Sequence, residues 1–243
     1  MARGRQIGRI KFQPIEPEHQ QKYYLDWDAK DLRARPESFP NLTSKELFGK
    51  AKPLEVEIGA GSGEYLCQIA SAQPETTFLG IEVSRRAAQL AVALAAQVGL
   101  ENVRILRADF RLLFPLLQPE SWQRVYLHFP DPMHKRRDEK RNLFDQKFLD
   151  AMASVLIPGG EVSVVSDKVD FFFQMLELAE GDGRFVKAHS EVYLEGFEPA
   201  IKSRFQLFSE RRGIRPRQFV LCKLAPVRLK SKAARVRAAY NET

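Results

Sequence analysis

The stretch HFPDPMHKRRDEKR, residues 128–141, places a conformationally fixed carboxylate beside a dense run of cations. Pro130 and Pro132 flank Asp131, and a proline fixes its own φ and keeps the residue before it out of the helical region. The run is either a solvated helix face or a grip for the phosphates of a polyanion, because Lys and Arg supply most backbone affinity in such interfaces. Its members are Lys135, Arg136, Arg137, Lys140 and Arg141.

A glycine-rich loop with the order E-x-G-x-G-x-G follows an apolar stretch. Its acid is Glu57 and its glycines are Gly59, Gly61 and Gly63. Such glycines let the backbone turn tightly and approach a ligand closely. The dinucleotide pattern GxGxxG needs a third glycine at position 64, which is glutamate here, and a pyrophosphate would sit poorly near Glu57. The loop is therefore either a plain tight turn or a nucleoside site that is not a dinucleotide site.

Two further acids stand at predicted strand ends. Glu82 closes the second strand, where a carboxylate can accept both hydroxyls of a ribose, and Asp109 follows the third. Each acid alone is typical of a solvated loop, but carboxyl ends of parallel strands meet at one edge of a sheet. Carboxylates there suit a cationic, phosphate-free nucleoside, because they bind a ribose and offset a nearby positive charge. S-adenosylmethionine matches that description.

The elements that must position these residues begin near residue 54. Short apolar strands are predicted at 54–58, 77–83, 103–108, 124–129 and 161–166. Helical stretches are predicted between and after them, at 63–72, 84–98, 143–156 and 169–179. This alternation indicates a parallel sheet with right-handed crossovers and helices on both faces. A turn is expected at 158–160, and further strands at 185–194 and 219–224.

The chain divides into three expected parts. Residues 1–50 are a partly irregular N-terminal extension with a short helix near Ser44–Phe48. Residues 51–225 form the main domain, and residues 226–243 are a basic C-terminal tail.

Bulk composition limits the class of protein. The net charge of +7 and the pI of about 9.4 favour an anionic partner, of which nucleic acid is the commonest. We find no run of eighteen apolar residues, so no membrane span is predicted. Cys67 and Cys222 lie far apart without a CxxC, which disfavours zinc and a disulfide scaffold. A reducing compartment, most simply the cytoplasm, is expected.

The order of motifs resembles the bacterial tRNA (guanine-N7)-methyltransferase family of class I S-adenosylmethionine-dependent enzymes. The family signature reads FPDPW-x-K-x-RH-x-KRR, and residues 129–142 read FPDPMHKRRDEKRN. The glycine loop, residues 80–83, residues 158–160 and 203–206 also resemble the family in order and spacing. The resemblance implies a Rossmann-like α/β fold: a mostly parallel seven-stranded sheet with helices on both faces and an antiparallel last strand. Residues 51–225 would then be the methyltransferase domain.

The resemblance also implies a role for each matching residue. The activity would be methyl transfer from S-adenosylmethionine to N7 of a guanosine in tRNA, in the variable loop. Asp131 would be catalytic, at the junction of cofactor and guanine, and the five cations after it would contact RNA phosphates. S-adenosylmethionine would be bound by Glu57, Gly59, Gly61, Gly63, Glu82, Asp109 and Asp131. Substrate would be bound by Lys135, Asp167, Ser203, Arg204, Phe205 and Gln206.

Five positions depart from the family pattern. Met133 replaces a tryptophan, Asp138 a histidine and Asn142 an arginine. In the late T-x-F/Y-E motif, Ser203 replaces threonine and Gln206 replaces glutamate. The serine keeps a hydroxyl, whereas the glutamine loses an ionic acceptor and gains a donor.

Other functions stay open. The same cofactor site could serve a different RNA or a small molecule, although the basic loop and tail favour RNA. A catalytically weak RNA-binding protein on this fold is a second alternative, suggested by Gln206 and Met133. A dehydrogenase is disfavoured by the broken GxGxxG. We expect tRNA as partner, no membrane and no metal, and the sequence leaves monomer and homodimer open.

Overall fold

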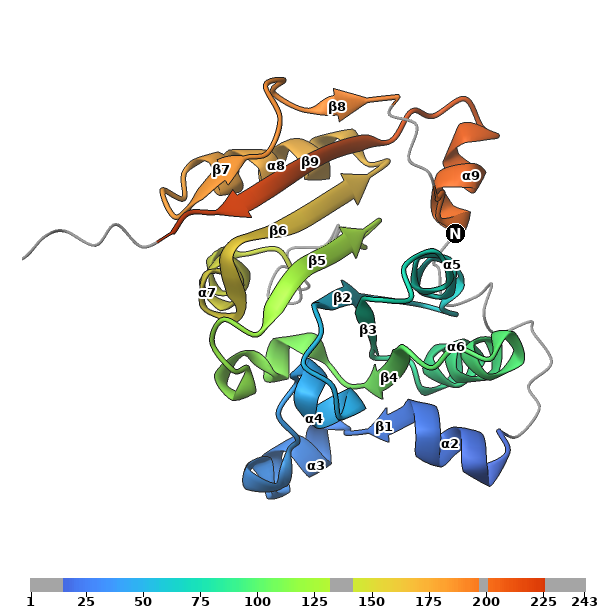
Figure 1. Cartoon of the computed structure of the whole chain (residues 1–243). Helices are drawn as coiled ribbons and strands as arrows, with labels where there is room; N and C mark the ends of the chain where they lie inside the picture. Colours follow the sequence, from blue (N-terminus) through green and yellow to red (C-terminus); the bar gives the residue numbers. More distant parts are fainter. Residues whose placement is uncertain (1–14, 132–141, 197–200, 226–243) are drawn as a thin grey trace, which may run out of the picture.

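A computed structural model describes residues 15–131, 142–196 and 201–225, and one sheet runs through this part of the chain (Figure 1). Its order is β1-β4-β3-β2-β5-β6-β9-β7, and β8 pairs with β9. In chain order the strands are β1 (Tyr24–Asp26), β2 (Leu54–Ile58), β3 (Thr77–Glu82), β4 (Val103–Arg107), β5 (Trp122–His128), β6 (Leu156–Ser166), β7 (Phe185–Lys187), β8 (Leu194–Glu195) and β9 (Arg217–Lys223).

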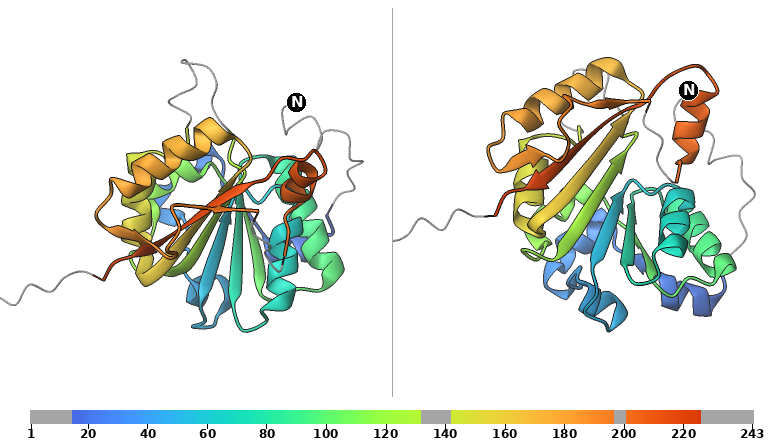
Figure 2. Two further views of the ribbon diagram at one scale, coloured as in Figure 1. Left: turned by 90° about the horizontal axis from the view of Figure 1, so that it is seen from above. Right: turned by 45° about the horizontal axis from the view of Figure 1, so that its top comes forward.

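Helices cover both faces of the sheet, with α5 and α6 on one side and α7 and α8 on the other (Figure 2). The α-helices of the described residues are α2 (Pro17–Tyr23), α3 (Ala29–Ala34), α4 (Ser44–Phe48), α5 (Glu64–Ala72), α6 (Arg85–Val98), α7 (Gln146–Val155), α8 (Val169–Glu180) and α9 (Arg204–Glu210). Short 3₁₀ turns lie at Pro36–Ser38 (η1), Phe110–Leu112 (η2) and Phe114–Leu116 (η3).

The strands divide the apolar side chains into two cores because successive side chains point to opposite faces. In β3, Phe78 packs with α5 and α6, whereas Leu79 packs on the side of α7 and α8. Val56 of β2 belongs to the second of these cores. Glu55 and Glu57, its neighbours in the strand, therefore project from the face that carries α5.

The predicted sheet direction is confirmed. All strand pairs from β1 to β6 are parallel, and β9 runs antiparallel between β6 and β7. The sheet has nine strands rather than seven. One reason is that the expected strand at 185–194 is divided into β7 and β8. Between them, the backbone amide of Val220 donates to the His189 imidazole at 3.3 Å instead of to a backbone carbonyl of a paired strand.

The turn expected at 158–160 lies inside β6 instead. Gly159 has a φ of 78°, and the pairing register with β5 shifts between Trp122 and Arg124. A glycine with positive φ at such an irregularity bends a strand without ending it.

The second reason for the extra strands is the N-terminal segment, which is more regular than expected. β1 adds a parallel edge strand to β4, and α4 lies where it was predicted. Tyr23, Leu32 and Leu42 are buried in the two cores, and the Trp122 indole donates to the Leu42 carbonyl at 2.8 Å. This segment is therefore part of the folded unit from residue 17 onward.

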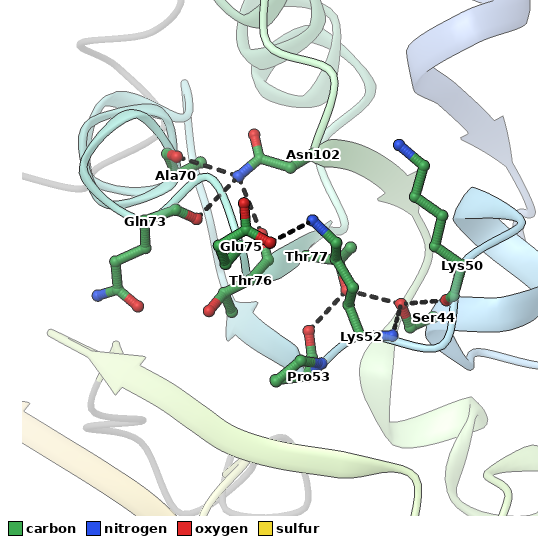
Figure 3. Close-up of polar contacts among 10 residues, drawn as sticks. All are labelled: Ser44, Lys50, Lys52, Pro53, Ala70, Gln73, Glu75, Thr76, Thr77 and Asn102. Atoms are coloured by element: carbon green, nitrogen blue, oxygen red, sulfur yellow. Dashed lines mark hydrogen bonds and ion pairs between the residues drawn. The ribbon is translucent and has the colours of Figure 1, made fainter.

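Side-chain hydrogen bonds fasten the loops at the amino ends of β2, β3 and β4 (Figure 3). The Asn102 amide nitrogen lies 3.0, 3.2 and 2.9 Å from the carbonyl oxygens of Ala70, Gln73 and Thr76. Ser44 accepts from the Thr77 hydroxyl at 3.0 Å, which joins α4 to the start of β3. These contacts lie at the edge of the sheet opposite the carboxyl ends of the strands, where ligands of open α/β sheets bind.

Candidate functional site

A cavity of about 590 Å³ lies at the carboxyl edge of the sheet, over the ends of β2, β3, β4 and β5. Each of these strands is followed by a segment that contributes to its wall. The glycine loop, the end of β3, the start of η2 and the segment after β5 all line it. Ligands of open α/β sheets bind at this position. Its polar side chains include Glu82, Ser84, Arg86, Asp109, Arg111, His128 and Asp131.

The glycine loop lines the cavity through Gly59 and Gly61. Gly59, Gly61 and Gly63 have φ values of 80°, 57° and 79°, a region that side chains with a Cβ rarely adopt. A Cβ added to Gly63 would come within 2.8 Å of the Ala91 Cβ, so this glycine lets α5 pack directly on α6. A Cβ on Gly59 or Gly61 would meet no atom within 4 Å, so a ligand can approach the backbone there.

Glu82 ties the end of β3 to the glycine loop. Its carboxylate accepts the Gly61 amide at 2.9 Å and the Ser84 amide at 2.7 Å. Burial raises the pKa of Glu82 above its usual value, and these backbone hydrogen bonds oppose that rise. The carboxylate is thus held in a fixed orientation at the cavity wall, with oxygen lone pairs left for a ligand.

Asp109 is engaged by its own loop. It accepts from the Arg111 amide at 3.1 Å and from the Arg111 guanidinium at 2.9 and 2.5 Å. Burial raises the pKa of Asp109, but the hydrogen bonds and charge of Arg111 outweigh it and hold the pKa below its usual value. The site therefore presents an ionised carboxylate whose partner, Arg111, lines the same cavity.

The segment after β5 contains a strained residue. Phe129 has a φ of 53°, which costs a bulky residue on the order of 1–3 kcal/mol. The Phe129 amide donates to the Val165 carbonyl at 2.7 Å, and its buried ring lies 6.1 Å from that of Phe205. These contacts fix the turn that brings Pro130 and Asp131 to the cavity wall.

A smaller hollow of about 40 Å³ lies between the glycine loop and α9, and Glu57 lines it. Glu57 is buried, and Oε2 has no hydrogen-bond partner within the described residues. Burial, then the neighbouring carboxylates of Glu64 and Glu82, raise the pKa of Glu57 well above its usual value. An unsatisfied buried carboxylate oxygen fits a cationic hydrogen-bond donor.

The late motif, residues 203–206, forms the first turn of α9. The Ser203 hydroxyl accepts a hydrogen bond from the backbone amide of Gln206 at 3.1 Å, as an N-cap does. The buried side-chain amide of Gln206 donates to Glu210 at 3.0 Å. Arg204 reaches Glu64 of α5 at 3.4 Å, and Phe205 lines both hollows. The helix therefore brings only part of this motif to the cavity.

The expected site residues thus fall into four groups. Glu82, Asp109 and Asp131 share the large cavity, with Gly59 and Gly61 between them. The small hollow adds Glu57, Ser203 and Arg204. Gly63, Asp167 and Gln206 line neither; Asp167 instead accepts from the Ser209 hydroxyl at 3.0 Å. Lys135, Arg136, Arg137, Lys140 and Arg141 lie outside the described residues, as do Met133 and Asp138.

Four polar cavity residues had no role in the sequence prediction: Ser84, Arg86, Arg111 and His128. Burial lowers the pKa of His128 to about 3, so the imidazole is neutral, and Nε2 lies 3.1 Å from the Ser163 hydroxyl. His128 ends β5 at the same edge as the three acids, which is the signal that could have identified it. For Arg111 the sequence signal is weaker: it is only a positively charged residue two positions after the acid Asp109.

Neither a metal centre nor a membrane span is present among the described residues. No group of three His, Cys, Asp or Glu side chains there is arranged to hold a metal ion. None of the helices described is both long and apolar enough to cross a bilayer.

Residues 51–212 match a family model described as "Putative methyltransferase". The chain is 46% identical over 209 residues to a tRNA (guanine-N(7)-)-methyltransferase of Rubrobacter xylanophilus, covering 86% of this chain and 94% of that protein. A protein of the same name from Chloroherpeton thalassium is 36% identical over 221 residues, covering 91% and 98%.

Solved structures share the fold. TrmN from Thermus thermophilus superimposes with a TM-score of 0.51 at 25% identity, over 72% of this chain and 45% of that one. The antibiotic-resistance methyltransferase Kmr superimposes with a TM-score of 0.52 at 16% identity, over 83% and 95%.

Proposed function

This chain belongs to the tRNA (guanine-N(7)-)-methyltransferase family, and from that premise we propose that it methylates N7 of a guanosine in tRNA with S-adenosylmethionine. The observation that carries the proposal is the convergence of Glu82, Asp109 and Asp131 on one cavity above the glycine loop. Relatives of that name align with most of the chain. All residues that line the cavity lie within the segment that matches the family model.

The residues of the cavity fit the cofactor. Glu82 stands where a carboxylate accepts ribose hydroxyls, and Gly59 and Gly61 leave room for a ligand against the backbone. In the smaller hollow, Oε2 of Glu57 has no hydrogen-bond partner in the described part of the chain, and it suits the ammonium of an amino acid. Asp109 contributes an ionised carboxylate nearby. When bound, S-adenosylmethionine supplies an electrophilic methyl group on a positively charged sulfur.

The protein's contribution to the reaction is alignment and charge. Guanine N7 has an in-plane lone pair, so no residue must first remove a proton. The product ring becomes cationic, and a carboxylate fixed beside it stabilises the developing charge. Asp131 has that position in our proposal, because the Phe129 turn holds it at the cavity wall. Phe205 of α9 would form one wall of the part of the cavity that receives the guanine base.

The late motif acts mainly through position in this proposal. Ser203 and Gln206 fix the first turn of α9, and that turn presents Arg204 and Phe205. A serine serves as an N-cap at least as well as a threonine. Asp167 has an oxygen without a partner among the described residues, so it can still accept a hydrogen bond from substrate. Lys135 and the cations that follow it would bind RNA phosphates.

We place the enzyme in the cytoplasm, where its tRNA substrate is found. We propose that residues 51–225 carry the methyltransferase site, which the family match to residues 51–212 supports, and that residues 226–243 are a basic tail. Residues 1–50 precede that domain in the sequence, and their described part packs into the same two cores. The first residues of the extension and the tail lie outside the described residues.

A methyl-transfer assay tests the function. Labelled S-adenosylmethionine and unmodified bulk tRNA are incubated with the protein, and the product is digested to nucleosides. N7-methylguanosine is expected. A different methylated nucleoside would move the target while keeping the reaction class, and tight tRNA binding without transfer would identify a non-catalytic RNA-binding protein.

A further inference from the structure

Helix α9 buries polar residues and exposes apolar ones. Ser203, Gln206 and Ser209, spaced three apart, are buried against the domain. Leu207 and Phe208, on the opposite side, are 42% and 47% exposed. A helix that only completed a core would show the reverse pattern, since its apolar stripe would face inward. The exposed side therefore needs an explanation outside the core.

Arginines surround these two apolar residues. Arg204, Arg211, Arg212 and Arg215 are exposed on this helix and the turn that follows it. The Arg212 guanidinium lies 5.5 Å from the centre of the Phe208 ring, within the range of a cation–π contact. We call Leu207, Phe208, Arg211 and Arg212 the outer face of α9.

The outer face carries no carboxylate of its own. The acid of this helix, Glu210, is half-buried and is held by Lys202 at 3.1 Å and by Gln206 at 3.0 Å. The charge that the outer face presents is thus positive, which selects an anionic partner. An aromatic ring flanked by guanidinium groups suits a nucleic acid, because bases stack on the ring while arginines contact phosphates.

The outer face adjoins a residue of the cavity lining, Phe205. Phe205 precedes Phe208 by three residues, lines the cavity and packs near Phe129. Arg204 pairs with Glu64 of α5 at 3.4 Å, and Figure 1 shows α9 beside α5. A seven-residue helix is only about 10 Å long, so a nucleotide next to one in the cavity can reach the outer face.

We propose that the outer face of α9 is a docking surface for tRNA, on which Phe208 stacks an unpaired base next to the methylated guanosine and Arg211 and Arg212 contact phosphates. The proposal rests on the proposed function for the identity of the RNA. A guanosine must leave its stack to enter a cavity, and a flanking base must then find another surface. Phe208 provides that surface in the enzyme.

Equilibrium binding of unmodified tRNA to Phe208 variants of the full chain tests the stacking. Phe208→Ala should weaken binding by about 5-fold to 100-fold, the range for loss of one stacked base. Phe208→Trp should retain the wild-type affinity, whereas Phe208→Leu, which is apolar but cannot stack, should behave as the alanine variant does. Phe173→Ala removes a comparably exposed phenylalanine from α8, 40% exposed, and should leave the affinity unchanged.

The salt dependence separates the arginines from the ring. Replacing Arg211 and Arg212 together by glutamine should reduce the slope of log affinity against log salt by about 0.7–0.9 for each phosphate that the protein no longer neutralises. Phe208→Ala should leave that slope unchanged, because stacking releases no counterions. All variants should bind S-adenosylhomocysteine as the wild type does, which excludes misfolding.

The failures are distinguishable. If the wild type methylates tRNA and Phe208→Ala binds it with wild-type affinity, the docking surface is overturned while the proposed function stands. If the wild type neither binds nor methylates tRNA, the proposed function fails and the docking surface with it. If Phe208→Ala leaves tRNA affinity unchanged but lowers the mass of the particle in solution, the outer face is an interface between copies of the chain.

Discussion

Single residues at the carboxyl edge carry several constraints at once. Glu82 is a hydrogen-bond acceptor for the glycine loop and a wall of the cavity. Asp109 is a helix-turn cap and half of an ion pair with Arg111. Phe129 accepts a strained backbone so that Asp131 reaches the site. A substitution there changes both local structure and the site, so tests need variants that separate the two.

Asp131→Ala should lower kcat by about 100-fold or more, because a fixed charge near the developing cation is removed. Cofactor affinity, measured by titration calorimetry, should change by only a few-fold. Asp170→Ala removes an exposed acid from α8 and serves as the control, since it lies outside the cavity lining. Loss of cofactor binding in Asp131→Ala would assign the residue to the cofactor instead.

The neutral His128 predicts how stability depends on pH. Burial lowers its pKa from 6.5 to about 3. Between these values the unfolded chain binds a proton that the native chain does not, so His128 destabilises the fold as the pH falls below 6.5, by at most about 1.4 kcal/mol per pH unit. His128→Gln cannot titrate and should unfold in urea with less loss of stability from pH 7 to pH 5. An equal loss in both proteins would show that the native imidazole takes up protons freely.

Individual elements are positioned by contacts at the edge of the sheet opposite the cavity. There the Asn102 amide holds the end of α5 and the loop before β3 to the start of β4. Ser44 does the same for α4 through Thr77. These contacts fix the amino ends of β3 and β4, whose carboxyl ends lead to Glu82 and Asp109 in the cavity.

Asn102→Ala should lower the free energy of unfolding by about 1–3 kcal/mol, because three loop carbonyls lose a donor. Asn102→Asp should cost more at neutral pH, since a carboxylate would face the same carbonyl oxygens. Urea denaturation measures both changes. Cofactor affinity of the folded variants should equal that of the wild type; a large loss would mean that this network reaches the site.

Sequence reasoning succeeded for elements whose residues have both a pattern and a chemical purpose. The geometry of a parallel sheet brings strand-end residues to one edge, so the convergence of Glu82 and Asp109 on one cavity could be predicted from the sequence. Their roles in binding, and that of Glu57, stay predictions. β1 was missed, because a three-residue strand has no periodicity to detect. Sequence reasoning missed α9 because the buried side of this helix consists of polar residues, Ser203, Gln206 and Ser209. A search for apolar residues at helical spacing treats such positions as exposed.

At the scale of the whole molecule, the sheet is extended by a segment from the N-terminal part. Tyr23 enters the core under α5 and α6, and Leu32 and Leu42 enter the core on the other face. The same stretch of chain thus contributes buried side chains to both cores. That stretch is expected to contribute to global stability rather than to behave as an appendage.

Leu42→Ala tests this at a side chain that is fully buried and whose carbonyl accepts from the Trp122 indole. The truncation should cost about 2–5 kcal/mol of unfolding free energy in one cooperative transition, as a core position does. Val98→Ala, at an exposed valine of α6, is the matched control and should cost far less. A separate early transition in Leu42→Ala would instead show that the segment unfolds independently.

The place of β9 has a consequence for synthesis. β9 lies between β6 and β7 in space, although it follows both in the chain. Until residues 217–223 leave the ribosome, β6 and β7 both lack the strand that pairs with them in the folded protein. Unpaired edges of apolar strands recruit other chains. A nascent chain of this protein therefore passes through an aggregation-prone interval of about fifty residues, which ends only when β9 inserts and pairs with both strands.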